Sequence, residues 1–212
     1  MRYNFIAIEG NIGAGKTTLA KKIAEQYNAK LILEQFEENP YLAKFYENPD
    51  RYSFQLEVSF LVDRFLQFKY DVARQELFKN FTIADYYISK SLIFAKNNLQ
   101  EQEYGLYTKM FDLLSKASPR PDLLVYLYIE VDQLLENIKQ RNRSYEQNIS
   151  KEYLENIQNI YLDFFKKQND MRILIIELKN LNYSYSEQYV EKIFKLLNNE
   201  YKTGITNCTI EI

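Results

Sequence analysis

Histidine is absent from this 212-residue chain, and cysteine occurs once, at Cys208. Without histidine, acid–base catalysis depends on carboxylates, on lysine or arginine, and on bound metal. A single cysteine forms neither a disulfide within the chain nor a cysteine metal cluster. Any active site therefore relies on charged side chains and metal.

Long apolar runs are missing as well. No stretch of about 18 apolar residues is present, so we expect no membrane-spanning segment. No charged and then apolar leader precedes the first predicted strand, which favours a cytoplasmic protein. The net charge is -2, so no basic field would attract nucleic acid. We expect a small-molecule substrate and no nucleic-acid partner.

Apolar segments of two kinds alternate along the chain. Hydrophobic residues make up 46% of it, enough for a packed core. We predict parallel strands at 5–8, 30–34, 82–85, 122–129 and 172–178. We predict helices at 19–26, 42–46, 51–78, 88–98, 105–115, 131–139, 151–167 and 187–198. This order indicates one α/β domain, 1–202, with a five-stranded parallel sheet between helices and a C-terminal tail, 203–212.

A glycine-rich loop between the first strand and the first helix is the most specific signal. It matches the phosphate-binding pattern G-x-x-x-x-G-K-[ST] through Gly10, Asn11, Ile12, Gly13, Ala14, Gly15, Lys16, Thr17 and Thr18. Glycines let backbone N–H groups face a phosphate chain, and the helix N-terminus adds positive potential. We expect Lys16 to reach the β- and γ-phosphates and Thr17 to hold Mg²⁺. An enzyme that uses ATP or GTP is the first hypothesis.

Two acids stand at the ends of predicted strands. Glu34 ends the second strand and Asp85 ends the third. Ligands of open α/β sheets bind outside the carboxyl ends of the strands, so we expect both acids beside the phosphate loop. A structural cap is the alternative for each of them.

The predicted helix 51–78 has polar residues at a spacing of seven. Glu57, Arg64 and Asp71 share one side of it, and the same helix carries an apolar stripe. A solvated face is the alternative interpretation, and we adopt it for Asp71.

These residues together resemble the deoxynucleoside kinase family, of the deoxycytidine, deoxyguanosine and deoxyadenosine kinase type. The resemblance runs from Gly10 through the helix that starts at Lys151. Besides the loop and Glu34, it uses Phe-Tyr-x-x-Pro-x-Arg-Tyr-Ser-Phe (45–54), Ile-Phe-Ala (93–95) and Arg-x-Arg-x-x-Glu-Gln (141–147). It implies a three-layer P-loop kinase fold with five parallel strands, a lid loop, and a homodimer packed through helices.

The resemblance also implies roles for individual residues. Glu34 looks like the general base on the nucleoside 5'-hydroxyl, and Asp85 like the acid that holds Mg²⁺ with Thr17. Arg141 and Arg143 resemble lid arginines that close on the phosphates of ATP. Tyr46 and Glu146 resemble the pair that grips the sugar 3'-hydroxyl, with Tyr46 crowding a 2'-hydroxyl. The adenine of ATP is expected near residues 180–183.

The chain departs from the family pattern in three places. Tyr86 follows Asp85 where the family usually has arginine. Lys90, on the same helical face, is the candidate replacement for that charge, and a surface lysine is the alternative. Tyr145 stands where many members have a second acid, and Glu57 where most have the Gln that reads the base.

The last departure leads to a prediction about the base. An ionised Glu57 only accepts hydrogen bonds and so suits the adjacent donors of guanine. A protonated Glu57 would imitate Gln and suit adenine, whereas thymine fits worst. Arg64 either meets O6 or N7 of a purine or forms a salt bridge to Glu57. We therefore predict purine deoxynucleosides as substrates.

Two other functions stay open. A nucleoside monophosphate kinase of the thymidylate type shares the loop, lid and sheet, but needs a basic site for the phosphate of its acceptor. A nucleotide-binding regulatory protein would transfer nothing. Glu34 and Asp85 argue against the regulatory protein, because binding alone needs no base.

Overall fold

The computed structural model describes residues 1–36, 39–72, 74, 76–179 and 186–211. Its sheet consists of β1 (Phe5–Gly10), β2 (Lys30–Ile32), β3 (Thr82–Ala84), β4 (Leu123–Tyr128), β5 (Arg172–Lys179) and β6 (Gly204–Glu211). All the pairings are parallel, and the strand order is β2-β3-β1-β4-β5-β6. The order reverses around β1, so the loop after β1 opens at the switch point where such sheets bind ligands.

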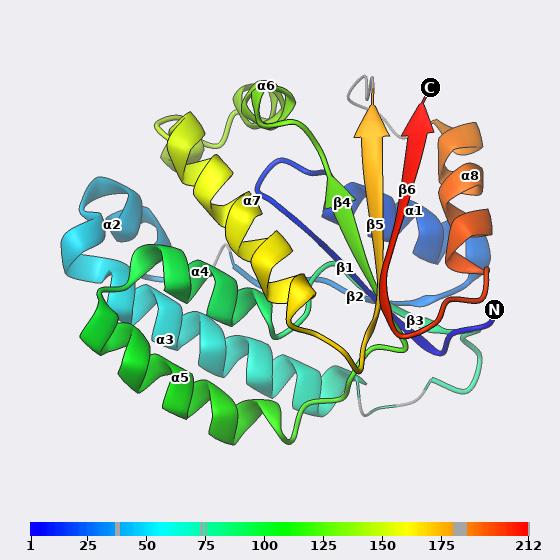
Figure 1. Ribbon diagram of the computed structural model, residues 1–212, viewed down its shortest axis with the longest axis horizontal. Coiled ribbons are helices and arrows are strands. Elements are labelled where there is room, and N and C mark those ends of the chain that lie inside the picture. Colours follow the sequence, from blue (N-terminus) through cyan, green and yellow to red (C-terminus); the bar gives the residue numbers. More distant parts are fainter. Residues whose placement is uncertain (37–38, 73, 75, 180–185, 212) are drawn as a thin grey trace.

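Helices cover both faces of this sheet (Figure 1). One face packs against α1 (Lys16–Tyr27), α6 (Val131–Arg141) and α8 (Glu187–Leu197). The other packs against α3 (Pro49–Gln67), α4 (Lys90–Asn98), α5 (Glu101–Ser115) and α7 (Lys151–Lys166). The short α2 (Leu42–Glu47) and a 3₁₀ turn, Ser144–Glu146, lie beyond the sheet. Alternate residues of β1 serve the two cores, Ile6 and Ile8 on one face and Phe5 and Ala7 on the other.

The three-layer α/β architecture confirms the predicted fold class, but the sheet has six strands instead of five. The predicted tail forms β6, whose eight residues pair in register with β5 from Arg172↔Gly204 to Lys179↔Glu211. The exposure of its side chains alternates, with Ile210 buried and Ile205 exposed on the opposite face. The two isoleucines are five residues apart and point to opposite faces, which hid the strand period.

The predicted helix 51–78 is also too long. The α-helix ends at Gln67 and a π-helical turn, Phe68–Val72, follows. The buried ammonium of Lys30 donates hydrogen bonds to the carbonyl oxygens of Asp71 and Arg74, which holds the turned backbone. Asp71 is therefore half-buried beside this turn and does not continue a solvated helical face.

No helix among the described residues is long and apolar enough to cross a membrane.

Candidate active site

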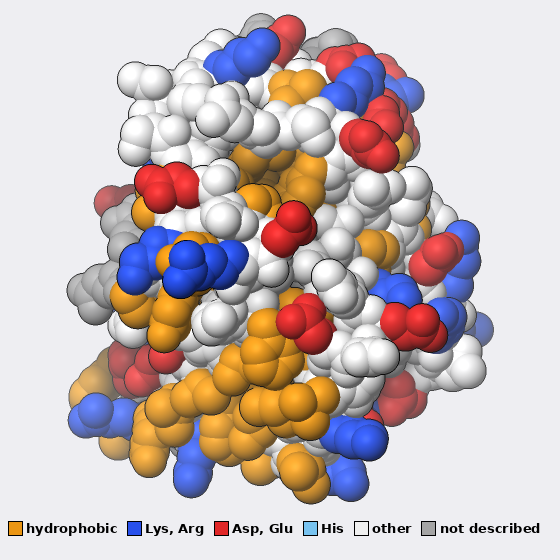
Figure 2. Space-filling view, turned by 90° about the vertical axis from the view of Figure 1, so that its left-hand side faces the viewer, with side chains coloured by type: hydrophobic (Ala, Val, Ile, Leu, Met, Phe, Trp, Pro, Cys, Tyr) orange, Lys and Arg blue, Asp and Glu red, His pale blue; other side chains and the backbone are white. Residues whose placement is uncertain are grey.

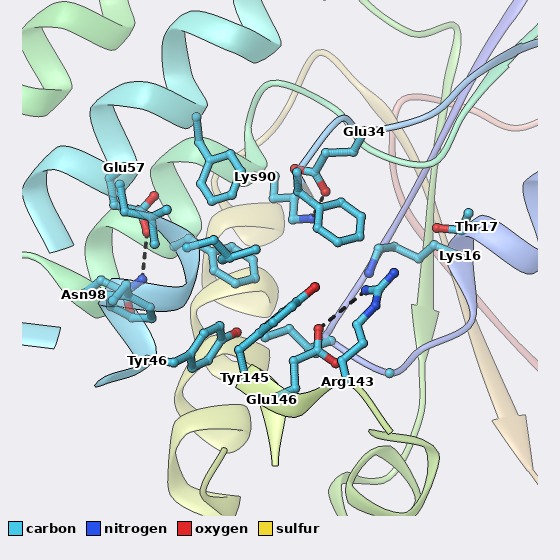
Figure 3. Close-up of a pocket in the computed structure, with 18 of the residues that line it drawn as sticks. Lys16, Thr17, Glu34, Tyr46, Glu57, Lys90, Asn98, Arg143, Tyr145 and Glu146 are labelled. Carbon is cyan, nitrogen blue, oxygen red and sulfur yellow. Dashed lines mark hydrogen bonds and ion pairs between the residues drawn. The ribbon is translucent and has the colours of Figure 1, made fainter. Parts of the chain in front are cut away.

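All the residues predicted to act in catalysis, substrate binding or metal binding line a single cavity (Figure 3). They are Lys16, Thr17, Glu34, Tyr46, Glu57, Arg64, Asp85, Lys90, Arg141, Arg143 and Glu146. Apolar side chains that the sequence prediction did not assign to the site complete the wall: Phe36, Leu42, Phe45, Leu56, Phe60 and Phe94. The cavity thus extends from the phosphate loop to a mostly apolar end between α3, α4 and α7.

The phosphate loop forms as the motif predicts. Gly13 and Gly15 have φ angles of 82° and 77°, in the left-handed region that favours glycine. A Cβ atom on Gly13 would lie 2.8 Å from the carbonyl oxygen of Leu134, so α6 also requires glycine there. The loop delivers the chain into the N-terminus of α1, whose first N–H groups are available to phosphate oxygens.

Lys16 is folded back onto the loop. Its Nζ donates to the carbonyl oxygens of Gly10 and Asn11 at 2.9 and 2.8 Å. Burial, followed by the nearby ammonium of Lys90, lowers the pKa of Lys16 to about 8. Burial and the like charge of Lys90 both destabilise the Lys16 cation. The oxygens of a bound phosphate would stabilise it.

Two asparagines hold the loop in place. Asn11, predicted as a phosphate-loop residue, turns its side chain away and donates from Nδ2 to the carbonyl oxygen of Leu154 on α7, at 2.8 Å. Asn137 on α6 donates to the carbonyl oxygen of Gly13, also at 2.8 Å. No sequence pattern indicated Asn137, because its role depends on how α6 packs against the loop.

Asp85 joins the phosphate loop to Glu34. Its Oδ2 accepts a hydrogen bond from the Thr17 hydroxyl, and its Oδ1 accepts one from the Glu34 backbone N–H at 2.8 Å. The described residues contain no group of three acids, histidines or cysteines that could hold a metal ion. One hydroxyl and one carboxylate nevertheless fit Mg²⁺, which takes one or two carboxylates and completes its shell with phosphate oxygens and water.

Glu34 is the most strongly paired acid of the site. Its Oε1 accepts a hydrogen bond of 2.8 Å from Arg64 Nε and forms an ion pair of 2.7 Å with Arg64 Nη2, and its Oε2 pairs with the Lys90 ammonium (Figure 3). Burial opposes ionisation, but Lys90 and Arg64 outweigh it and lower the pKa of Glu34 to about 2. Glu34 is therefore a fixed carboxylate at neutral pH.

These contacts decide two alternatives. Lys90 is 9% exposed and contacts Glu34, so it is not a surface lysine. The guanidinium of Arg64 pairs with Glu34 rather than with Glu57, and it also donates a hydrogen bond of 2.8 Å to the Ser91 hydroxyl. The contact with Glu34 differs from both alternatives predicted for Arg64, a purine and Glu57. The spacing of seven correctly placed Glu57 and Arg64 on one side of α3. Arg64, two turns further along the helix, contacts Glu34 instead of Glu57.

The lid segment, residues 141–146, lines the other side of the cavity. Arg141 ends α6, and both it and Arg143 form ion pairs with Glu146 in the 3₁₀ turn, the latter at 3.5 Å. The Arg143 guanidinium also lies over the Phe36 ring, 4.6 Å from its centroid. The Tyr145 ring stacks on that of Tyr46 at 5.8 Å.

Glu57 lies at the apolar end of the cavity, 1% exposed. Its Oε1 accepts a hydrogen bond of 2.7 Å from Asn98 Nδ2, whereas Oε2 is buried without a hydrogen-bond partner among the described residues. Burial raises the pKa of Glu57 to about 7, although Arg64, Asn98 and Lys90 favour the ionised form. The sequence prediction missed Asn98, the last residue of α4, which reaches Glu57 only because α4 packs against α3 in the folded chain.

Comparison with known proteins agrees with this geometry. The sequence model of the family described as deoxynucleoside kinase matches residues 6–201. The chain belongs to the deoxynucleoside kinase family. It is therefore an enzyme, a kinase that transfers a phosphoryl group to an alcohol group.

Individual relatives of this deoxynucleoside kinase are similar over most of its length. A deoxyguanosine kinase from Bacillus subtilis is 42% identical over 154 residues, which cover 72% of this chain and 74% of the relative. A deoxyadenosine kinase from Dictyostelium discoideum is 38% identical over 168 residues, which cover 76% of this chain and 66% of the relative. A solved structure of deoxyadenosine kinase from M. mycoides with bound dATP has a TM-score of 0.77 and 27% identity, covering 92% of this chain and 98% of that one.

The matched region ends before β6. The segment predicted to bind the adenine of ATP, residues 180–183, lies outside the described residues.

Proposed function

We propose that this kinase uses ATP and Mg²⁺ to phosphorylate the 5'-hydroxyl of purine deoxynucleosides, giving 5'-monophosphates for nucleotide salvage in the cytoplasm. The observation that supports this best is the position of Glu34. Asp85 links the Glu34 backbone to the phosphate loop, while the Glu34 carboxylate lines the cavity with the apolar end beyond it. A carboxylate between a phosphate site and an acceptor site is what transfer to a hydroxyl requires.

Glu34 would accept the proton of the 5'-hydroxyl. Its low pKa does not exclude this role, because the hydroxyl becomes acidic only as its bond to phosphorus forms. A carboxylate with such a pKa is also ionised at every physiological pH. Arg64 and Lys90 fix its orientation, and Lys90 stands in for the arginine that the family usually has after Asp85.

Positive charge on the other side of the cavity would stabilise the transferring group. Lys16, which donates to carbonyl oxygens of its own loop, would turn to the β- and γ-phosphates. Arg141 and Arg143 would exchange part of their pairing with Glu146 for contacts to phosphate oxygens as the lid closes. Thr17 and Asp85 would hold Mg²⁺, which neutralises charge on the phosphate oxygens when bound.

The acceptor would lie in the rest of the cavity. Tyr46, stacked on Tyr145, and Glu146 would contact the deoxyribose, leaving little room for a 2'-hydroxyl. The base would lie among the aromatic side chains next to Glu57. The names of two relatives, a deoxyguanosine kinase and a deoxyadenosine kinase, support a purine.

The alternatives fit less well. A thymidylate-type kinase needs free cations for the phosphate of its acceptor, but Arg64 and Lys90 are both engaged by Glu34. A regulatory protein that only binds nucleotide needs no base, whereas Glu34 is an ionised carboxylate that lines the cavity.

One assay tests the proposal. The protein is incubated with ATP and Mg²⁺ and, separately, with each deoxynucleoside, ribonucleoside and nucleoside monophosphate, and products are separated by chromatography. We expect 5'-monophosphates from purine deoxynucleosides. Diphosphates formed only from monophosphate acceptors would instead support the thymidylate-type kinase, and ATP binding without any product would support the regulatory protein.

We also propose a homodimer formed through α3 and α5. Exposed apolar side chains gather on the face of these adjacent helices, in the lower part of Figure 2. They are Val62 and Leu66 on α3 and Leu106 and Leu113 on α5, the last of which is 76% exposed. A contiguous patch of this kind favours association. Light scattering should show a dimer that Leu113→Glu dissociates, while Ile205→Glu on β6, another exposed apolar position, leaves it intact.

A further inference from the structure

The hydrogen bonds of Asn98, which contacts Glu57, determine which carboxylate oxygen of Glu57 can meet a ligand. Asn98 Oδ1 accepts two hydrogen bonds, from Asn97 Nδ2 at 3.0 Å and from the Tyr153 hydroxyl at 3.1 Å. The Asn97 amide nitrogen can only donate, so the oxygen of Asn98 must face it. Asn98 Nδ2 is thereby directed at Glu57 Oε1, 2.7 Å away.

This arrangement assigns different roles to the two oxygens of Glu57. Oε1 faces a donor and must remain an acceptor, so a proton on Glu57 has to be on Oε2. Oε2 is the oxygen that is buried without a partner, in a residue that lines the cavity. A buried carboxylate oxygen without a hydrogen bond is costly, and a ligand atom is the partner it lacks.

We propose that Asn98 and Tyr153 are positioning residues that restrict the proton of Glu57 to Oε2, so that the protonation of this one oxygen selects the base. An ionised Oε2 accepts a hydrogen bond and takes a 6-oxopurine, whose N1 carries hydrogen. A protonated Oε2 donates one and takes a 6-aminopurine, whose N1 is an acceptor. This inference rests on the proposed phosphorylation of purine deoxynucleosides.

The surroundings of Glu57 keep both forms accessible. Burial favours the protonated form, and so does the carboxylate of Glu34 after β2. Arg64 on its own helix and Lys90 on α4 favour the ionised form. From α5 the Tyr107 hydroxyl donates to the Glu57 backbone carbonyl, and from α7 burial raises the pKa of Tyr153, whose hydroxyl therefore stays a donor. The balance leaves the pKa of Glu57 at about 7.

The test measures a ratio, which cancels the pH dependence of every step shared by the two substrates. Deoxyguanosine and deoxyadenosine compete in one reaction between pH 5.5 and 8.5. The kcat/KM for deoxyguanosine divided by that for deoxyadenosine is plotted against pH. We expect the ratio to rise through neutral pH by about tenfold to a hundredfold, the cost of mismatching one buried donor or acceptor. In Glu57→Gln, which cannot titrate, the ratio should not change with pH.

Substitutions of Asn98 and Tyr153 test their role in positioning the proton of Glu57. Asn98→Leu removes a donor to the ionised form, so the midpoint of the ratio should move to higher pH. Tyr153→Phe should move it in the same direction by less, and Tyr104→Phe, a half-buried tyrosine on α5, should not move it. A wild-type ratio that is constant with pH, a Glu57→Gln ratio that still rises, or a midpoint unaffected by Asn98→Leu would overturn the inference.

A measurement without substrate separates this inference from the proposed function. The carboxyl carbon of Glu57, assigned by comparison of ¹³C-Glu-labelled protein with Glu57→Gln, should titrate near neutral pH and at higher pH in Asn98→Leu. Failure to phosphorylate any nucleoside would refute the proposed function and with it the selection. Phosphorylation of both purines at a constant ratio, with no such titration, would refute only the selection.

Discussion

Replacing Glu34 with Gln tests the centre of the proposed mechanism and has two separable effects. The amide keeps the shape of the side chain and one acceptor but cannot take up the proton of the 5'-hydroxyl. General-base catalysis contributes about 10² to 10⁴ in rate, so kcat should fall by that factor with a smaller change in KM. An unchanged kcat with a raised KM would show that Glu34 only orients the substrate.

The second effect is on stability. Lowering the pKa of Glu34 from 4.5 to about 2 corresponds to about 3 kcal/mol in favour of the folded, ionised form. Removing one partner of a buried ion pair costs a similar amount, about 3–5 kcal/mol, and Glu34→Gln leaves both Arg64 and Lys90 without a counter-charge. For a chain of this size we expect a melting temperature lower by about 6–12 °C at pH 7.

The pH dependence of stability follows from the direction of this pKa shift. Because the pKa is lower in the folded state, the contribution of Glu34 is fully present above pH 4.5 and is lost as the pH falls towards 2. Urea unfolding of wild type and Glu34→Gln should therefore differ by a constant amount from pH 7 to pH 5, and by less below pH 4.5. Glu155→Gln, an exposed site on α7, is the control. A melting temperature equal to that of the wild type would refute the inferred ion-pair network.

Three further predictions follow from the same structure. Lys16→Ala should lower kcat/KM by about a hundredfold or more with little change in melting temperature, because among the described residues Lys16 Nζ donates only to loop carbonyls; near-normal turnover would refute the kinase mechanism. Thr17→Val should raise the Mg²⁺ concentration needed for half-maximal activity, whereas Thr17→Ser should not, and an equal requirement in both would remove Thr17 from the metal site. Deleting 203–212 should lower the melting temperature by about 5 °C or more, since it removes a strand paired along all of β5 and exposes the contacts of Ile210; an unchanged value would contradict the pairing of β6.

The sequence by itself determined the phosphate loop and the order of β1–β5. Gly13 and Lys16 identify a phosphate site locally, since a short run of glycines before a helix N-terminus suffices to make one. Glu34 and Asp85 follow because parallel strands bring their carboxyl ends to one edge of the sheet. No long-range contact had to be known for these features.

Only the tertiary structure decided what the other site residues contact. The helical spacing put Glu57 and Arg64 on one side of α3 but could not show that Arg64 reaches Glu34, or that Asn98 from α4 reaches Glu57. Partners of this kind come from separate elements, so they depend on how helices cross and which rotamers the core allows. The same holds for β6, where Gly204–Glu211 forms a strand because the edge of β5 offers unpaired backbone groups, although its own alternation is weak.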